Sequence, residues 1–233
     1  MNGSTLVKVA RLHLVDRVSF TVLPWGVVAF ELVLWLLLIS AAGGGGGRPV
    51  PIPGAVAGIY IVFAVVGVLS MTRSLPFAFA LGVSRRSYYA GTVLLAVGLS
   101  VVYGLALAAL AVAERATGGW GLGLEFFRID YILSGSWYVI WLTSSVLLAL
   151  MFTYGMWCGL IYRRWNLPGL LAFLAAQAVA GLIFLIAAGR ADAWTAIGSF
   201  FTNLTAAGLT GLLAALAALL LAGGYATMRH VTV

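Results

Sequence analysis

The chain has 233 residues, of which 63% are hydrophobic and only 8% are charged. Soluble domains carry about 25% charged residues, so a water-soluble fold is excluded and the surrounding solvent must be lipid. The net charge of +7 would suit nucleic acid, but the positions of the charges indicate membrane topology instead.

Six apolar runs are each long enough to cross a bilayer, which takes about 20 residues of helix. They lie near 20–42, 52–72, 91–113, 136–162, 168–188 and 199–224. Lipid cannot bond free backbone groups, so spans are helices or closed barrels, and these runs lack the alternation of barrel strands. We predict an all-α polytopic membrane protein. One domain of six transmembrane helices covers 20–226, between a connecting segment at 1–19 and a tail at 227–233.

The basic residues predict the orientation of these helices, because an even number of spans puts both ends on one side. That side carries Lys8, Arg11, Arg17, Arg73, Arg85, Arg86, Arg163, Arg164 and Arg229 against Asp16. The other side carries Arg48, Arg115, Arg128 and Arg190 against Glu114, Glu125, Asp130 and Asp192. The positive-inside rule therefore places both termini in the cytosol, and the charge predicts no nucleic-acid partner. The excess of arginine over lysine is typical of GC-rich bacterial genomes, so we expect a bacterial cell membrane.

The first apolar run carries Glu31 near its middle. A carboxylate there costs about 2.5–3.5 kcal/mol on the insertion scale, so it indicates a partner, a cavity or a function. One interpretation is a protonated or hydrogen-bonded side chain at a helix contact, and the other is a residue that lines a substrate path. No intramembrane lysine or arginine in the sequence pairs with it, and both interpretations stay open.

Glycines have two predicted uses. The run from Gly43 to Gly47 makes a flexible loop, and it is not a phosphate-binding loop because no Lys-Ser/Thr follows it. Gly155 and Gly159 in the fourth apolar run have the small-xxx-small spacing that lets two helices approach closely.

The loop at about 73–90, between the second and third runs, holds an apolar stretch that is too short to cross a membrane. Ser74 can cap the start of a helix, Pro76 suits its first turn, and Gly82 can end it. A short helix is therefore predicted within this loop, after Arg73.

Apolar side chains divide between two faces of this predicted helix. One face carries Phe77, Ala80 and Leu81, and another carries Phe79 and Val83. Arginines bracket the helix on both sides. The phenylalanines could enter lipid while the arginines meet head groups, or the helix could dock into a cleft of a cytosolic partner. These residues alone do not decide between lipid and protein.

Two further short helices are predicted on the outer side. Residues 117–135 combine glycine, aromatic and charged residues, and they resemble a short helix resting at the outer interface. Residues 190–203 form a separate short helix before the last span.

Groups for catalysis are scarce. His13 and His230 stand near opposite ends of the chain without metal-ligand spacing, and Cys158 is the only cysteine. We therefore expect no intrinsic catalysis and no metal site.

Two stretches, together with the six spans, resemble a known family. They are Leu75–Gly91 (LPFAFALGVSRRSYYAG) and Glu114–Gly121 (ERATGGWG). This combination resembles the permease subunits of actinobacterial ABC transporters, which are similar to export permeases of the type V fold. The resemblance implies that the loop at 73–90 is the coupling helix that meets an ATPase. That role falls on Arg73, Ser74, Leu75, Pro76, Phe77, Phe79, Leu81, Val83, Arg85 and Arg86.

The resemblance also implies partners. Two copies of the chain, or this chain with a paralogous permease, would enclose an export pathway. Two cytosolic ATP-binding subunits would hold the ATP and magnesium, because this chain has no Walker A sequence and is expected to bind no cofactor. The N-terminal segment would be the family's connecting helix, and residues 190–203 its extracellular helix. The rival hypothesis is a non-transporting assembly factor or regulatory subunit that docks a cytosolic partner through the same loop.

Overall fold

A computed structural model describes residues 18–43, 50–52, 56–128, 133 and 135–228, and it is all-α apart from one pair of two-residue strands. The predicted connecting segment at 1–19 and the tail at 227–233 lie almost wholly outside the described residues. The elements are η1 Val18–Val22, α2 Leu23–Ala41, β1 Val50–Pro51, α3 Ala57–Leu69, η2 Ser70–Ser74, α4 Leu75–Ala80, α5 Arg85–Ala116, η3 Gly119–Gly123, β2 Leu124–Glu125, α6 Trp137–Arg190, α7 Trp194–Asn203 and α8 Ala206–Met228. The all-α prediction is confirmed.

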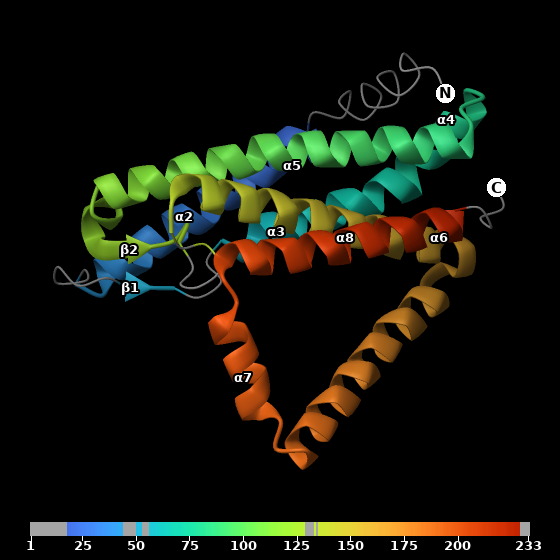
Figure 1. Ribbon diagram of the computed structural model, residues 1–233. Helices are drawn as coiled ribbons and strands as arrows, with labels where there is room; N and C mark the ends of the chain where they lie inside the picture. The colour runs from blue at the N-terminus through green and yellow to red at the C-terminus, as the bar shows by residue number, and fades with distance from the viewer. Residues whose placement is uncertain (1–17, 44–49, 53–55, 129–132, 134, 229–233) are drawn as a thin grey trace.

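Five helical segments among the described residues are long and apolar enough to cross a membrane. The sequence predicted six apolar runs, and the difference lies in α6. This element of 54 residues joins the runs at 136–162 and 168–188. Asn166 interrupts it with φ 54° and ψ −158°, and Pro168 follows. Figure 1 shows α6 as two arms that diverge at a sharp bend.

The bundle is built around the first arm of α6, which contacts α3, α5 and α8. Gly155 lies directly on α3, because a Cβ added there would stand 1.9 Å from the Ala64 carbonyl oxygen. A Cβ on Gly159 would stand 2.9 Å from the Val68 carbonyl oxygen. The close approach predicted from the spacing of these two glycines is therefore confirmed. Helix α8 is joined to the same arm by a buried hydrogen bond of 2.7 Å between Thr143 and Thr210.

The second arm of α6 leaves the bundle, and α7 leads the chain back toward α8 (Figure 1). No residue from 167 to 187 is buried. Two contacts near the bend join the arms. The Tyr154 hydroxyl donates to the Gln177 side chain at 2.9 Å, and the rings of Trp157 and Phe173 meet edge to face. Helix α7 confirms the short helix predicted within 190–203.

The described residues within 117–135 form no right-handed helix, so the short helix predicted there is wrong for residues 117–128. Gly118, Gly119, Trp120, Gly121 and Gly123 all have positive φ, which a right-handed helix cannot accommodate. The chain makes the single tight turn η3 there and then enters β2, which pairs in parallel with β1. The high glycine content therefore favoured a left-handed turn over a helix.

Candidate partner-docking site at the α4 turn

The α4 turn, residues 70–86, connects the ends of α3 and α5 and lies at one end of the bundle (Figure 1). Its helix α4 stops where the sequence predicted. Gly82 has φ +76°, its N–H donates to the Phe79 carbonyl at 2.9 Å, and the Val83 N–H donates to the Ala78 carbonyl at 3.0 Å. This is the Schellman arrangement that terminates a helix at glycine.

The start of α4 differs from the prediction. Ser74 has helical dihedrals and makes no capping hydrogen bond, because α3 passes through the π-helical turn η2 into α4 without a break. The capping serine is Ser84, whose side chain accepts from the Ser87 N–H at 3.2 Å at the start of α5. Pro76 lies in the first turn of α4, and because the helical winding is continuous, its missing N–H removes a bond to a carbonyl of the preceding turn.

The two faces of α4 meet different environments. Leu75 and Ala78 are fully buried, whereas Phe77 is 56% exposed and Leu81 is 61% exposed. Phe79 and Val83 are partly buried and pack against the core. The exposed surface of α4 is therefore an apolar pair one turn apart, on a helix whose other face fixes it to the bundle.

Arginines surround that apolar pair. Arg73, Arg85 and Arg86 are all exposed, and the sequence has no acidic residue between 73 and 86. An apolar surface rimmed by positive charge fits an acidic or anionic counterpart better than a neutral one.

Two neighbouring helices fix the turn through η2. The Tyr88 hydroxyl, on α5, donates to the Ser70 carbonyl. The Arg163 guanidinium, on α6, donates to the Thr72 carbonyl at 3.3 Å. The Phe79 ring meets the Tyr88 ring edge to face at 6.4 Å. The α4 turn is therefore bonded to the bundle on two sides.

Glu31 lies away from the α4 turn, against the start of α3. Its carboxylate accepts a backbone hydrogen bond from Gly58, and a Cβ on Gly58 would collide with it. First-turn N–H groups have no partner within their own helix and attract negative charge. This contact fits the interpretation of a hydrogen-bonded glutamate between helices. The substrate-path interpretation stays a prediction.

Glu114, at the opposite end of α5 from the α4 turn, is a structural residue whose role the sequence reasoning missed. Its side chain is fully buried at the end of α5 and accepts from the N–H groups of Phe126 at 2.8 Å and Phe127 at 3.0 Å. Arg128 adds a third bond at 3.2 Å and also pairs with Glu125 at 2.6 Å. A signal was present in the sequence, since a carboxylate at the end of an apolar run preceded a turn with an arginine.

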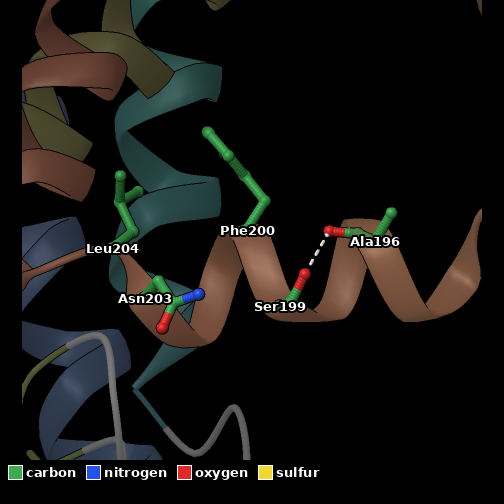
Figure 2. Close-up of a pocket in the computed structure, with 5 residues that line it drawn as sticks. All are labelled: Ala196, Ser199, Phe200, Asn203 and Leu204. Atoms are coloured by element: carbon green, nitrogen blue, oxygen red, sulfur yellow. Dashed lines mark hydrogen bonds between the residues drawn. The ribbon is translucent and has the colours of Figure 1, made fainter.

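Two hollows in the described part of the chain are lined without histidine, cysteine or acidic side chains. Figure 2 shows that one is lined by α7 and Leu204 alone, with Ser199 bonded to the Ala196 carbonyl. Another, of about 290 Å³, lies between α5, α6 and α8 and is almost entirely apolar. Among the described residues no group of three histidine, cysteine or acidic side chains could hold a metal ion. The α4 turn is thus the best-defined candidate site.

Comparison of the chain with protein-family models, with curated proteins and with solved structures found no match. The resemblance to ABC permeases therefore stays a prediction from the sequence.

Proposed function

We propose that this chain is the permease subunit of an ABC-type transporter and that α4 is its coupling helix. The observation that carries the proposal is the α4 turn, where Phe77 and Leu81 are exposed while Leu75, Ala78 and Tyr88 fix the opposite face in the core. Exposed apolar side chains rimmed by arginines suit a protein partner or a lipid surface, and the resemblance favours the protein partner.

The proposed topology has six spans, with each arm of α6 crossing separately. An unbroken helix of 54 residues would extend about 80 Å, far beyond a hydrocarbon core of about 30 Å. Asn166 and Pro168 divide it where Arg163 and Arg164 supply positive charge. Both ends of the chain and the α4 turn then lie on the basic, cytosolic side.

In the proposed assembly, two separate cytosolic ATPase subunits bind and hydrolyse ATP. A second permease copy, or a paralogue, completes the pathway. Movement of the ATPase pushes on α4 and switches the pathway between inward and outward access. The direction, export across a bacterial cell membrane, comes from the resemblance, and the apolar groove between α5, α6 and α8 is compatible with a hydrophobic cargo.

The experiment is co-purification with an ATPase subunit that carries a Walker A sequence and is encoded beside this chain. We expect Phe77→Asp combined with Arg85→Glu to abolish association and coupled ATP hydrolysis while membrane insertion is retained. The first change puts a charge on the apolar contact and the second reverses a rim charge.

The matched control applies the same two changes far from α4, as Phe200→Asp with Arg190→Glu, both at exposed positions. Association should survive there. Unchanged binding in the α4 double variant would exclude the coupling-helix assignment. Binding of the ATPase without transport of any cargo would favour the rival hypothesis of a non-transporting assembly or regulatory subunit.

A further inference from the structure

The turn η2 carries an unusual set of hydrogen bonds. Within six residues, side chains donate to four backbone carbonyls. Ser70 donates to Gly67 at 2.7 Å and Thr72 donates to Val68 at 3.0 Å. Tyr88 donates to Ser70 and Arg163 donates to Thr72 at 3.3 Å.

These bonds supply donors to backbone carbonyls where the helical winding changes. A change from α-helical to π-helical winding alters which N–H each carbonyl meets, and single π-turns inside α-helices are frequent at functional sites. In an apolar environment each carbonyl left without a partner costs several kcal/mol. Serine and threonine make such bonds elsewhere in the helices, so the distinctive bonds at η2 are those that Tyr88 and Arg163 supply from other helices.

Two of the four donors come from other helices. Ser70 and Thr72 belong to η2 itself, but Tyr88 is on α5 and Arg163 is on α6. Tyr88 is fully buried, and its ring meets the Phe79 ring of α4 edge to face. Gly159 lets the backbone of α6 approach the same junction, with no room for a side chain between them. Three helices therefore meet at η2.

We propose that η2 is the joint through which movement of α4 reaches the bundle, with Tyr88 and Arg163 as the positioning residues that transmit it. The inference rests on the proposed function. Helix α4 has its own terminator at Gly82, so it does not need either bond to stay folded. Loss of the Tyr88 or the Arg163 bond therefore has a selective effect. The partner still binds to α4, but movement of α4 no longer reaches α5 or α6.

Arg163 has a feature that suits a moving joint. Its Nε is buried and has no hydrogen-bond partner among the described residues. A buried donor without a partner is costly, so a shift of η2 that brought a carbonyl to this Nε would recover that cost. The joint thus has a donor available for a second arrangement.

The test uses pairs of adjacent residues as matched variants. Tyr88→Phe removes the bond to η2, whereas Tyr89→Phe removes an equivalent bond of 2.7 Å to the Leu221 carbonyl on α8. Arg163→Met removes the second bond to η2, whereas Arg164→Met removes an exposed arginine that stacks on Trp165. Arg163→Lys keeps a donor and should restore much of the wild-type behaviour.

The first measurement is amide hydrogen exchange at residues 70–74, the turn η2, in the full chain purified without any partner. We expect Tyr88→Phe and Arg163→Met each to speed exchange there about five- to tenfold, as loss of one buried hydrogen bond does. Tyr89→Phe and Arg164→Met should leave that stretch unchanged. Equal exchange in Tyr88→Phe and Tyr89→Phe overturns the inference without touching the proposed function.

The second measurement adds the ATPase subunit. We expect Tyr88→Phe and Arg163→Met to bind it within about twofold of wild type, while stimulation of ATP hydrolysis falls at least about fivefold. Full stimulation in both variants overturns the inference while the coupling-helix assignment stands. A wild-type chain that binds no ATPase overturns the proposed function, and transmission through η2 with it.

Discussion

Two carboxylates lie in apolar surroundings, and the structure satisfies them in different ways. Glu114 is fully buried and receives two backbone N–H groups and the Arg128 side chain. Glu31 is only partly buried and faces the first turn of α3 through Gly58. One of its oxygens, Oε2, has no partner among the described residues. Glu114 is therefore a fully bonded structural residue, whereas Glu31 has an unused acceptor.

The bonds around Glu114 predict that removing Glu114 lowers the stability of the protein more than removing Glu125. We expect Glu114→Ala to lower the free energy of unfolding by about 3 kcal/mol, since it leaves Arg128 and two buried N–H groups without their acceptor. Glu125→Ala should cost less than about 1 kcal/mol, because Glu125 pairs with the same arginine at a more exposed position. Unfolding of both purified variants in the same detergent, followed by heat or denaturant, measures the difference. Equal losses would contradict the central role of Glu114.

Much of this residue-level detail had a sequence signal. The termination at Gly82 and the division between Phe77 and Phe79 could be predicted from residue type and helical spacing. The sequence could not show whether Ser74 caps a helix. A serine is a cap only where a helix begins, and α3 continues through η2 past Ser74 into α4. The partner of Glu31, Gly58, comes from a segment distant in the chain, so no local pattern shows it.

The elements were easier to predict than their boundaries. The apolar runs correspond to α2, α3, α5, α6 and α8 because a span needs a long apolar segment whatever its neighbours are. Helix α7 was expected, but the turn at η3 was not. A run of glycines there can take left-handed dihedrals at little cost, and the tertiary contacts of the turn decide between that and a helix.

Contact between α3 and α6 gives a prediction at the scale of elements. Gly155→Ala would place a methyl group 1.9 Å from the Ala64 carbonyl oxygen, so the two helices must separate. We expect a loss of at least about 1–3 kcal/mol, as for other overpacked sites. Gly98→Ala, on α5, meets open space and should be neutral or slightly stabilising, since alanine favours helix over glycine. Thermal unfolding of the two variants provides the comparison, and a Gly155→Ala protein as stable as Gly98→Ala would show that the helices pack otherwise.

At the scale of the whole molecule, the bundle and the second arm of α6 differ in how far their side chains are buried. The bundle contains the buried residues, while the arm at 167–187 has none. The sequence could not show this, because a lipid-facing helix and a packed one have the same apolar composition. It did mark the boundary, since Arg163, Arg164 and Pro168 all fall at the bend.

The proposed topology can be checked with single cysteines. Cys158 is buried, and Cys158→Ala gives a background without thiols. Ser84 and Ser199 are both exposed, one beside the α4 turn and one on α7. We expect a membrane-impermeant maleimide to label Ser199→Cys in intact cells and Ser84→Cys only in inverted vesicles, because the arginines around Ser84 favour the cytosol. Labelling of both from the same side would contradict six spans.

The order of synthesis gives the bonds of α8 a particular meaning. Thr143, Trp157 and Tyr89 hold α8 through Thr210, Thr227 and the Leu221 carbonyl, and all three donors or acceptors precede α8 in the chain. Until α8 has left the ribosome, these polar groups on α5 and α6 have no such partner. The bundle can therefore close only after the exposed arm of α6 and α7 have been made, since α8 follows them in the chain.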